Sequence, residues 1–439
     1  MKPLKLFLMI IFPVLLAGNI QAQSWSSLGS GMNGDVNAVI EFNGDIIAGG
    51  EFTTAGGVNA NYVARWDGSQ WNPMGSGFNA PVYTLKVYNG EIYAGGNFTT
   101  SNGTFVGYIA KWNGSSWDKV GNGLNDEVKS LGIYNNTLVA GGSFTNAGGT
   151  SANFVASWNG TSWSSLGSGM NDQVFAFTVF NGDLIAAGSF STAGGNSANN
   201  IARWDGSTWS ALGSGLSDRT FALTVYDNKL IAGGEFETGN YVMQWNGSSW
   251  SSVGGGVEDR VYALTVYNNE LVAAGQLMSA GSTSANRIAR WNGSSWSSFS
   301  SGMDNKVEAL TVIGDALIAG GEFFQAGGNS ALKIAAWNYN PTAISNVGNS
   351  ISNEYKLAQN YPNPFNPSTT INFNVPKQSF VILKAYDLSG KEVANLVNGN
   401  LSPGEYTYNF DASSLSTGVY IYQLSAGDFT QTKKMTLIK

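Results

Sequence analysis

The stretch TFALTVYDNKLIAGGEFETGNYVMQWNGSSWSSV, residues 220–253, decides the fold class. It contains four short runs with β-forming composition, and Asp-Asn, Gly-containing and Asn-Gly-Ser-Ser turns separate them. Apolar residues do not follow a sustained helical period. The stretch therefore predicts a four-stranded antiparallel sheet, with strands at Thr220–Tyr226, Lys229–Phe236, Asn240–Trp245 and Trp250–Val253.

The same pattern recurs along the chain, and tryptophan pairs mark each copy. The motif W-[DN]-G-[ST]-x-W spans the turn between the third and fourth runs. First members of successive pairs are 46 residues apart, except for 41 residues between Trp204 and Trp245. A period of roughly 40 to 50 residues built from four strands is typical of a β-propeller. The pairs, with Trp25 and Trp337 as two separated halves of a seventh, use all 14 tryptophans: Trp66/Trp71, Trp112/Trp117, Trp158/Trp163, Trp204/Trp209, Trp245/Trp250 and Trp291/Trp296.

The two ends of the repeat region complement each other. Residues 24–29, SWSSLG, have the sequence of a fourth strand without the preceding three, and the last unit stops at Trp337 after three strands. A ring that joins these ends leaves no exposed sheet edge. We therefore predict an all-β, seven-bladed β-propeller over residues 24–338, closed by its own N-terminal strand.

The repeat also predicts how the blades pack. We expect the tryptophan rings to fill the wide outer space between neighbouring blades. The small residues of the second strand, such as Ala48-Gly49-Gly50, suit the narrow inner part. The alternative is that the tryptophans form exposed platforms for sugar rings.

These residues resemble two kinds of known propeller repeat. An apolar strand that ends in Gly-Gly, followed by an aromatic residue and then by Trp, is similar to kelch-like repeats. WSSLGSGMNGDV (25–36) and IIAGGEFTTAGG (46–57) resemble the cortical-marker type of repeat still more closely. The resemblance implies a propeller fold and leaves function open, because propellers carry many unrelated activities.

One face of the predicted ring is the better candidate for binding. The first-to-second and third-to-fourth connections are tight, whereas the second-to-third and interblade connections are long and share the opposite face. The fifth unit lacks five residues near 237–240, which predicts a notch there. Polar residues follow the Gly pair or precede the first strand on the long-loop face, and our candidates among them are Glu51, Asn97, Glu235, Glu322, Asp35, Asp126, Asp172 and Asp259.

Two interpretations of these polar residues remain. Oxygen-rich loops are able to hold Ca²⁺, which takes six to eight oxygen ligands. The simpler interpretation is turn chemistry, because Asp and Asn side chains stabilise turns through the nearby backbone. No calcium-loop spacing occurs in the sequence. We therefore predict no cofactor and no metal, with calcium as the alternative.

Composition excludes several classes of function. The formal charge of −7 and the pI of about 4.8 argue against a nucleic-acid partner. The chain has no His and no Cys, which removes Ser-His-Asp and thiol nucleophiles and the usual zinc ligands. A glycosidase that uses two carboxylates remains chemically possible. The leading prediction is that the protein is not an enzyme.

The first residues have the features of a secretory signal peptide. Lys2 and Lys5 precede an apolar run, and Ile20-Gln21-Ala22 suits cleavage between Ala22 and Gln23. We predict a signal peptide over residues 1–22. No later apolar stretch approaches 18 residues, so no transmembrane segment is predicted in the mature protein.

Composition changes again after Trp337. Residues 339–355 are polar and without period, which predicts a linker. Apolar and polar residues alternate in four runs, which predicts β-strands there and a small Ig-like β-sandwich over 356–439. The runs are Thr370–Val375, Phe380–Asp387, Glu405–Phe410 and Val419–Leu424.

The tail resembles the type A C-terminal sorting domain of the type IX secretion system of Bacteroidetes-like bacteria. The resemblance implies export, recognition by the type IX secretion machinery as a partner, and location at the outer-membrane surface or outside the cell. It rests on the motifs YPNPF, DLSGK, GVY and the closing KKMTLIK, and the residues that it marks as the sorting signal are Tyr361, Pro362, Asn363, Pro364, Phe365, Gly390, Gly418, Tyr420, Lys433, Lys434 and Lys439.

Together these features predict an exported β-propeller that binds an extracellular polysaccharide or surface protein without catalysis. A carboxylate-dependent carbohydrate-active enzyme and a structural surface-layer component are the alternatives.

Overall fold

The computed structural model describes residues 24–236, 240–338, 345–348, 354–377, 379–401, 403–412 and 415–439. Every regular element in these residues is a β-strand, so the predicted all-β class is confirmed. Within the same residues, no helix of a length and apolarity suited to crossing a bilayer occurs. The predicted signal peptide and its cleavage residues, Ala22 and Gln23, lie outside the described residues.

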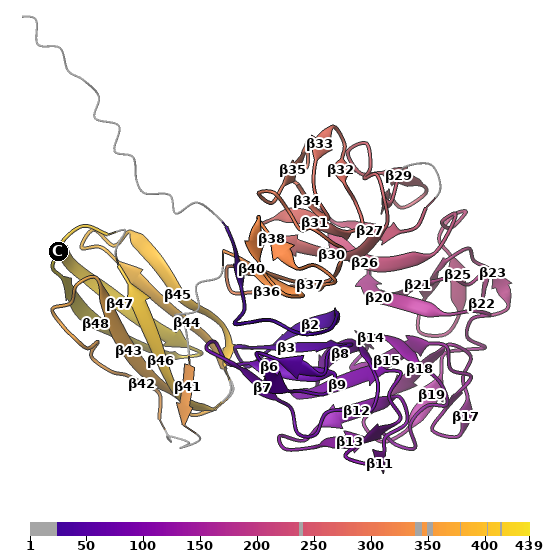
Figure 1. Cartoon of the computed structure of the whole chain (residues 1–439), viewed down its shortest axis with the longest axis horizontal. Coiled ribbons are helices and arrows are strands. Elements are labelled where there is room, and N and C mark those ends of the chain that lie inside the picture. Colours follow the sequence, from indigo (N-terminus) through magenta and orange to yellow (C-terminus); the bar gives the residue numbers. More distant parts are fainter. Residues whose placement is uncertain are drawn as a thin grey trace, which may run out of the picture.

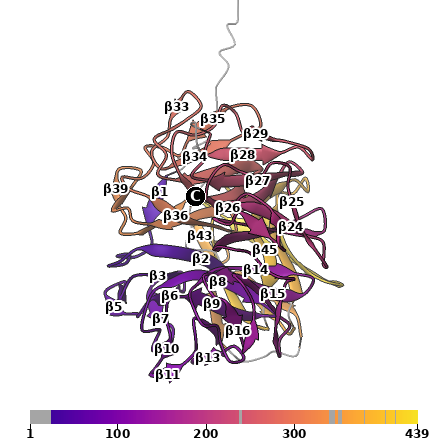
Figure 2. The same cartoon turned by 90° about the vertical axis from the view of Figure 1, so that its right-hand side faces the viewer.

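Seven four-stranded antiparallel sheets lie between Trp25 and Trp337, and we number them 1 to 7 along the chain. Figure 1 shows them as a ring, and Figure 2 shows the same sheets turned by 90°. Sheets 1 to 4 consist of β2 (Val36–Phe42), β3 (Asp45–Gly50), β6 (Val63–Trp66) and β7 (Trp71–Pro73); β8 (Val82–Tyr88), β9 (Glu91–Gly96), β12 (Ile109–Trp112) and β13 (Trp117–Lys119); β14 (Val128–Tyr134), β15 (Thr137–Gly142), β18 (Val155–Trp158) and β19 (Trp163–Ser165); and β20 (Val174–Phe180), β21 (Asp183–Gly188), β24 (Ile201–Trp204) and β25 (Trp209–Ala211).

The remaining three sheets follow the same order, with the first strand of each nearest the axis of the ring (Figure 1). We call these first strands the inner strands. Sheets 5 to 7 consist of β26 (Thr220–Tyr226), β27 (Lys229–Gly234), β28 (Val242–Trp245) and β29 (Trp250–Ser252); β30 (Val261–Tyr267), β31 (Glu270–Gly275), β34 (Ile288–Trp291) and β35 (Trp296–Ser298); and β36 (Val307–Ile313), β37 (Ala316–Gly321), β40 (Ile334–Trp337) and β1 (Trp25–Ser27).

The N-terminal strand closes the ring, as the repeat pattern predicts. β1 pairs with β40 in antiparallel register, with Trp25 opposite Trp337. The last sheet also lies directly against the first, since a Cβ placed on Gly320 would lie 2.5 Å from Val36 Cγ1. The same close approach occurs between Gly49 and Val82, where a Cβ would again lie 2.5 Å from Cγ1. The narrow inner part of the ring therefore restricts this position of the second strand to small residues, which are Gly in five sheets and Ala in sheets 4 and 6 (Ala187 and Ala274).

The tryptophan pairs join each sheet to the preceding one. All 14 rings are buried or half-buried, and ring centroids within a pair lie 5.2 to 5.5 Å apart. This confirms packing between sheets and shows that the exposed-platform alternative is wrong. The second ring of each pair donates a hydrogen bond from Nε1 to a backbone carbonyl at the end of the preceding sheet: Trp71 to Leu28, Trp117 to Met74, Trp163 to Val120, Trp209 to Leu166, Trp250 to Leu212, Trp296 to Val253 and Trp25 to Phe299.

The long connections between second and third strands are more ordered than the sequence indicated. Six of them fold into a two-stranded hairpin around a Gly-containing turn. The described residues of sheet 5 carry no such hairpin, and 237–239, where the notch was predicted, lie outside the described residues. The hairpins are β4 (Thr54–Ala55) with β5 (Val58–Asn59), β10 (Thr100–Ser101) with β11 (Thr104–Phe105), β16 (Asn146–Ala147) with β17 (Thr150–Ser151), β22 (Thr192–Ala193) with β23 (Asn196–Ser197), β32 (Ser279–Ala280) with β33 (Thr283–Ser284), and β38 (Gln325–Ala326) with β39 (Asn329–Ser330).

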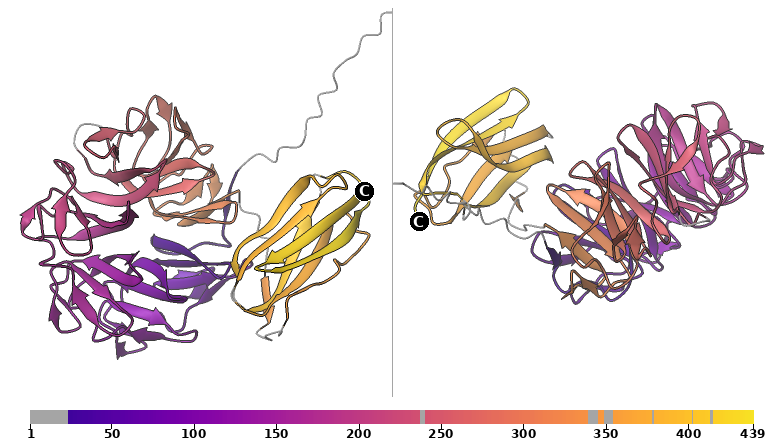
Figure 3. Two further views of the ribbon diagram at one scale, coloured as in Figure 1. Left: turned by 180° about the vertical axis from the view of Figure 1, so that it is seen from behind. Right: turned by 90° about the horizontal axis from the view of Figure 1, so that it is seen from above.

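The tail folds as two four-stranded sheets around its own apolar core (Figure 3). The predicted linker, 339–355, contains a strand, β41, that extends one of these sheets by pairing with β46. Tyr355 also packs against the tail core, so the sandwich begins before residue 356. The sheets are β41 (Ser345–Gly348), β46 (Gly404–Asp411), β43 (Ser368–Val375) and β42 (Lys356–Leu357); and β45 (Glu392–Leu401), β44 (Ser379–Tyr386), β47 (Gly418–Ala426) and β48 (Phe429–Leu437).

Candidate functional site

Every inner strand contains a β-bulge at its second residue. In β2, for example, Val36 pairs with Gly50 and Ala38 with Gly49, which leaves Asn37 without a partner residue. A bulge turns one side chain out of the regular alternation, and bulges are frequent next to functional sites. The bulged residues, one from each sheet in order, are Asn37, Tyr83, Lys129, Phe175, Phe221, Tyr262 and Glu308.

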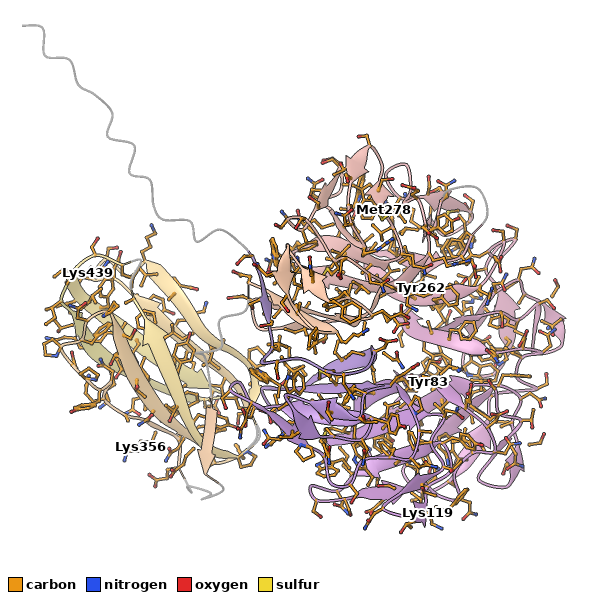
Figure 4. All side chains as sticks on the ribbon, viewed as in Figure 1. Tyr83, Lys119, Tyr262, Met278, Lys356 and Lys439 are labelled. Carbon is orange, nitrogen blue, oxygen red and sulfur yellow. The ribbon has the colours of Figure 1, made fainter. Side chains whose placement is uncertain are left out.

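The bulged residues lie together at the mouth of the central channel. An open hollow of about 250 Å³ is lined by all of them except Phe221, with the next two residues of the inner strands beneath. Figure 4 places Tyr83 and Tyr262 toward the middle of the ring. Residues from all seven sheets thus line one hollow, which we call the channel mouth.

Aromatic rings form one side of the channel mouth. The rings of Phe175, Phe221 and Tyr262, from sheets 4, 5 and 6, follow one another with centroids 5.5 and 5.1 Å apart. All three side chains are half-buried, so part of each remains accessible. On the other side, Lys129 Nζ lies 3.9 Å from the centroid of the Tyr83 ring. Partly accessible aromatic faces beside polar groups are suited to ligands with both apolar and polar surfaces.

A polar rim surrounds the channel mouth and is built in the same way in every sheet. The backbone N–H of the residue after the second strand donates to the carbonyl of the residue before the inner strand, as from Glu51 to Asp35 at 2.8 Å. This bond holds two side chains per sheet at the edge of the hollow. The other pairs are Asn97 with Pro81, Ser143 with Glu127, Ser189 with Gln173, Glu235 with Arg219, Gln276 with Arg260, and Glu322 with Lys306.

The cations of the mouth and rim all have acidic partners. Lys129 Nζ lies 2.6 Å from a carboxylate oxygen of Glu127. Glu235 contacts the guanidinium groups of both Arg219 and Arg260, the former at 2.9 Å. Lys306 lies 2.8 Å from both Glu308 and Glu322, and Lys333 lies 2.8 Å from Asp35. The positive charges of Lys129, Arg219, Arg260, Lys306 and Lys333 are therefore each paired with a carboxylate of the protein.

Burial and pairing also shift the pKa values of these groups. Burial raises the pKa of the Glu308 carboxyl above its usual range, and Lys306 opposes that effect only in part. Burial by itself would lower the pKa of Lys306, but hydrogen bonds with Glu308 and Glu322 raise it. The hydrogen bond to Glu235 raises the pKa of Arg260. Lys306 and Arg260 therefore keep their charges at neutral pH.

The predicted ligand-face residues divide into two groups. Glu51, Asn97, Glu235, Glu322 and Asp35 do lie on the polar rim. Asp126, Asp172 and Asp259 lie one residue further from the inner strand, and each Oδ1 accepts a hydrogen bond from the next backbone N–H at 2.7 to 2.8 Å.

The expectation that Asp35 occupies the same position as those three Asp residues is therefore wrong. Asp35 directly precedes Val36, as Glu127 directly precedes Val128, so its equivalent in sheet 3 is Glu127 rather than Asp126. The three Asp side chains stabilise turns, as the simpler interpretation had it. Within the described residues, no three acidic side chains converge in the way that a metal ion requires.

The bulged residues were missed by the sequence interpretation, although the sequence contains a signal for them. Aligned inner strands read VNAV, VYTL, VKSL, VFAF, TFAL, VYAL and VEAL. The second position alone varies between amide, aromatic, cationic and acidic side chains. When one strand position varies while its neighbours are nearly the same in all seven sheets, its side chain does not take part in the packing between sheets that keeps those neighbours alike.

The sorting-signal residues of the tail occupy both its surface and its core. Tyr361, Pro362, Asn363 and Pro364 are exposed, Tyr361 at 81%, whereas Phe365 is 1% exposed and belongs to the core. Asn363 Oδ1 accepts a hydrogen bond from Thr436 N–H at 2.9 Å, and Phe365 N–H donates to the Thr436 carbonyl. The YPNPF segment is thus attached to the closing strand β48.

The other predicted sorting residues lie along the turns and strands of the same sandwich. Gly390 has a φ of 84° in the turn that follows β44, a backbone conformation that favours Gly. Gly418 begins β47, and the hydroxyl of Tyr420 donates to the Ser416 carbonyl at 2.7 Å. Lys433 is half-buried on β48, whereas Lys434 and Lys439 are exposed near the C-terminus.

Comparison with protein families identifies both parts of the chain. The model of the secretion system C-terminal sorting domain matches residues 359–439. The Rax2 C-terminal beta propeller domain matches 16–173, and a beta-propeller domain of unknown function, DUF5122, matches 181–204. The chain is a β-propeller followed by a type IX sorting domain. The kelch-like label is not exact, because the matching propeller models belong to other families.

The sorting domain decides where the propeller acts. Domains of this kind direct proteins through the type IX secretion machinery to the outer-membrane surface or the extracellular space. This agrees with the location and the secretion partner expected from the YPNPF and KKMTLIK motifs. No curated protein sequence matches the chain.

One solved structure covers most of the chain. PorZ of Porphyromonas gingivalis, described as an essential bacterial surface component of the type IX secretion system, is 14% identical over 92% of this chain, with a TM-score of 0.44. The matched region spans 60% of the PorZ chain.

Proposed function

We propose that this exported propeller is a non-catalytic binding protein whose channel mouth binds an extracellular polysaccharide. The observation that supports the proposal is the set of seven bulges: six of the seven bulged side chains, which range from amide and aromatic to cationic and acidic, line one hollow at the centre of the ring. Accessible aromatic rings beside hydrogen-bonding groups suit sugar rings, which have apolar C–H faces and polar edges.

Two arguments favour binding over catalysis. The described residues contain neither His nor Cys, and the acidic residues nearest the hollow are engaged with Lys or Arg. A glycosidase needs one carboxyl group that donates a proton and a second that is free to attack or to activate water. Glu308 and Glu127 are each held by a lysine of their own sheet, which suits a fixed hydrogen-bonding surface.

The experiment is a thermal-shift measurement of the purified protein against a panel of soluble polysaccharides. A ligand that binds only the folded state raises the melting temperature by mass action. We expect a rise with at least one polysaccharide, no release of reducing ends during incubation, and loss of the rise in Phe175→Ala.

Phe180→Ala is the matched control, because Phe180 lies at the other end of the same strand and is also half-buried. It should lower stability while leaving the polysaccharide-induced rise intact. An absence of any rise with every polysaccharide overturns the proposal in favour of a protein partner or a structural role. Production of reducing ends that disappears in Glu308→Gln overturns it in favour of an enzyme.

A further inference from the structure

We propose that the channel mouth recognises a single uncharged sugar unit, stacked on the rings of Phe175 and Tyr262, at the end of a glycan chain. This inference rests on the polysaccharide-binding function proposed above and specifies its ligand. It follows from three features of the mouth: its size, its paired charges and the existing partners of its tyrosine rings.

The size of the hollow limits the length of ligand that it holds. Its volume of about 250 Å³ lies below the roughly 300 to 1,000 Å³ of pockets that enclose drug-sized molecules. The hollow is also surrounded on all sides by inner strands from seven sheets, so a polymer cannot lie across it at the level of the rings. Entry of a chain end satisfies both constraints.

The charges exclude an anionic ligand as the preferred one. The cations at the bulged positions and on the polar rim each have a carboxylate within salt-bridge distance: Lys129 has Glu127, Arg219 and Arg260 share Glu235, and Lys306 lies between Glu308 and Glu322. An acidic sugar would have to displace one of these partners and leave its carboxylate unpaired. An uncharged sugar requires no such exchange.

The tyrosine rings argue against an organic cation in the same hollow. Lys129 Nζ lies over the Tyr83 ring at 3.9 Å, and Lys306 Nζ lies over the Tyr262 ring at 5.2 Å. The ammonium groups of Lys129 and Lys306 therefore already make the cation–π contacts that these two rings offer, which leaves less attraction for a cationic ligand. Stacking of a neutral C–H face requires no positive charge, and the side chains of Phe175 and Tyr262 both keep part of their surface exposed.

A hydrogen-bonding network beside Tyr262 supplies groups for sugar hydroxyls. The Gln276 amide oxygen accepts from Arg260 Nη1 at 3.2 Å and from the Tyr262 hydroxyl at 3.4 Å. The Arg260 guanidinium also donates to Glu235. The network thus places a guanidinium, an amide and a hydroxyl group beside the Tyr262 ring, and such groups suit sugar hydroxyls, since each hydroxyl both donates and accepts.

The test is isothermal titration calorimetry of the purified protein. The ligands are neutral gluco-oligosaccharides of increasing length, in α- and β-linked series, and acidic oligogalacturonides of the same lengths. For the series that binds, we expect affinity to stop rising after about two units and to change by less than about twofold between low and high salt. Oligogalacturonides should bind at least about tenfold more weakly. Phe175→Ala and Tyr262→Ala should each weaken binding by about tenfold, and Phe180→Ala by less than about twofold.

The outcomes separate this inference from the proposed function. If affinity continues to rise with chain length, or if oligogalacturonides bind better and lose affinity in salt, the protein binds polysaccharide but the single-neutral-unit inference is wrong. If only high polymers bind, the inference is also wrong. If no glycan of any length or charge binds, both fail. Should Phe175→Ala not fold, Tyr262→Phe tests the same surface, since it removes one hydroxyl oxygen and keeps the packing volume of the mouth nearly intact.

Discussion

The two ends of the inner strands differ although they belong to the same seven β-strands. At the bulged end the side chains vary from Asn37 to Phe221 to Glu308. At the other end six of the seven last residues are Phe or Tyr, and buried hydroxyls join neighbouring sheets, as from Tyr267 to the Asp315 carbonyl at 2.8 Å. Residues that hold the ring together are uniform because every sheet meets the same neighbour. Residues released from that contact by a bulge are free to differ, and this difference is the reason why we propose the bulged end as the binding site.

The largest effect should come from removing a tryptophan that joins two sheets. Trp163→Ala removes a buried ring that packs against Trp158 and donates to the Val120 carbonyl. We expect a loss of about 3 to 5 kcal/mol in the free energy of unfolding, measured by chemical denaturation. Phe175→Ala, at the bulged end, should cost far less stability and affect ligand binding instead. Equal losses of stability in the two variants would contradict the distinction between packing and binding positions.

A second large effect should come from Gly254, which lies under the first tryptophan of the following pair. Its φ is +57°, and an added Cβ would lie 2.1 Å from Trp291 Cζ3. Gly254→Ala should therefore destabilise the ring by about 1 to 3 kcal/mol, because the crowded Trp291 ring has to move. Gly314→Ala is the matched control, since its φ of +54° is nearly the same and a Cβ there meets nothing within 4 Å. Denaturation midpoints that fall equally in both variants would show that backbone strain alone is responsible.

A smaller and sharper comparison uses two tyrosines on the same strand. Tyr267→Phe removes the hydroxyl that bonds to Asp315 and should cost about 1 kcal/mol of stability without affecting binding. Tyr262→Phe removes a half-buried hydroxyl at the channel mouth and should change stability by less than about 0.5 kcal/mol. Its glycan affinity should fall by about two- to fivefold. The reverse pattern, measured by denaturation and titration, would place the binding site at the other end of the channel.

A fourth comparison concerns pH and lies on the tight-turn face. Burial raises the pKa of Asp45 from 3.8 to about 6, against the attraction of Arg65. Because ionisation of a carboxyl with a raised pKa opposes folding, the parent should lose stability as pH rises from about 4 to about 6. Asp45→Asn should remove that loss, so its stability relative to the parent should increase over this range and stay constant above it. The half-exposed Arg65–Asp45 pair, which the substitution also removes, should contribute less than about 1 kcal/mol. If the free energies of unfolding of the parent and of Asp45→Asn change in parallel between about pH 4 and about pH 6, the prediction is contradicted.

Much of the fold was predictable because the evidence for it is local and repeated. Turn residues, β-forming runs and the W-[DN]-G-[ST]-x-W motif recur at nearly fixed spacing, so the strands assigned in one repeat unit predict the strands of the other units. The strands predicted in residues 220–253 agree with β26 to β29 within two residues at every end. The hairpins between second and third strands were not predicted, because two-residue strands have no measurable alternation. β45 and β48 of the tail were missed as well, since their polar outer residues weaken the pattern.

The site was harder to predict than the fold. The sequence placed Glu51, Asn97, Glu235 and Glu322 on one face, where the structure has the polar rim, because the lengths of the connections show which ends of the strands share a face. The sequence interpretation grouped Asp35 with Asp126 because both precede an inner strand. Asp35 is the last residue before its strand and lies on the polar rim, whereas Asp126 is one residue earlier and stabilises a turn. The aromatic rings of the mouth were overlooked, since a Phe or Tyr within a strand usually belongs to the core.

The sequence by itself determined the repeat, the closure of the ring by Trp25–Ser27 and the sorting tail, because each depends on motifs and spacings that are local to the chain. Tertiary structure alone decided which side chains meet at the centre. Residues 37, 83, 129, 175, 221, 262 and 308 are far apart in sequence and come together only because seven sheets converge on one axis. Each is turned toward that axis by a bulge, and a bulge is defined by pairing with a neighbouring strand, which single-strand patterns do not record.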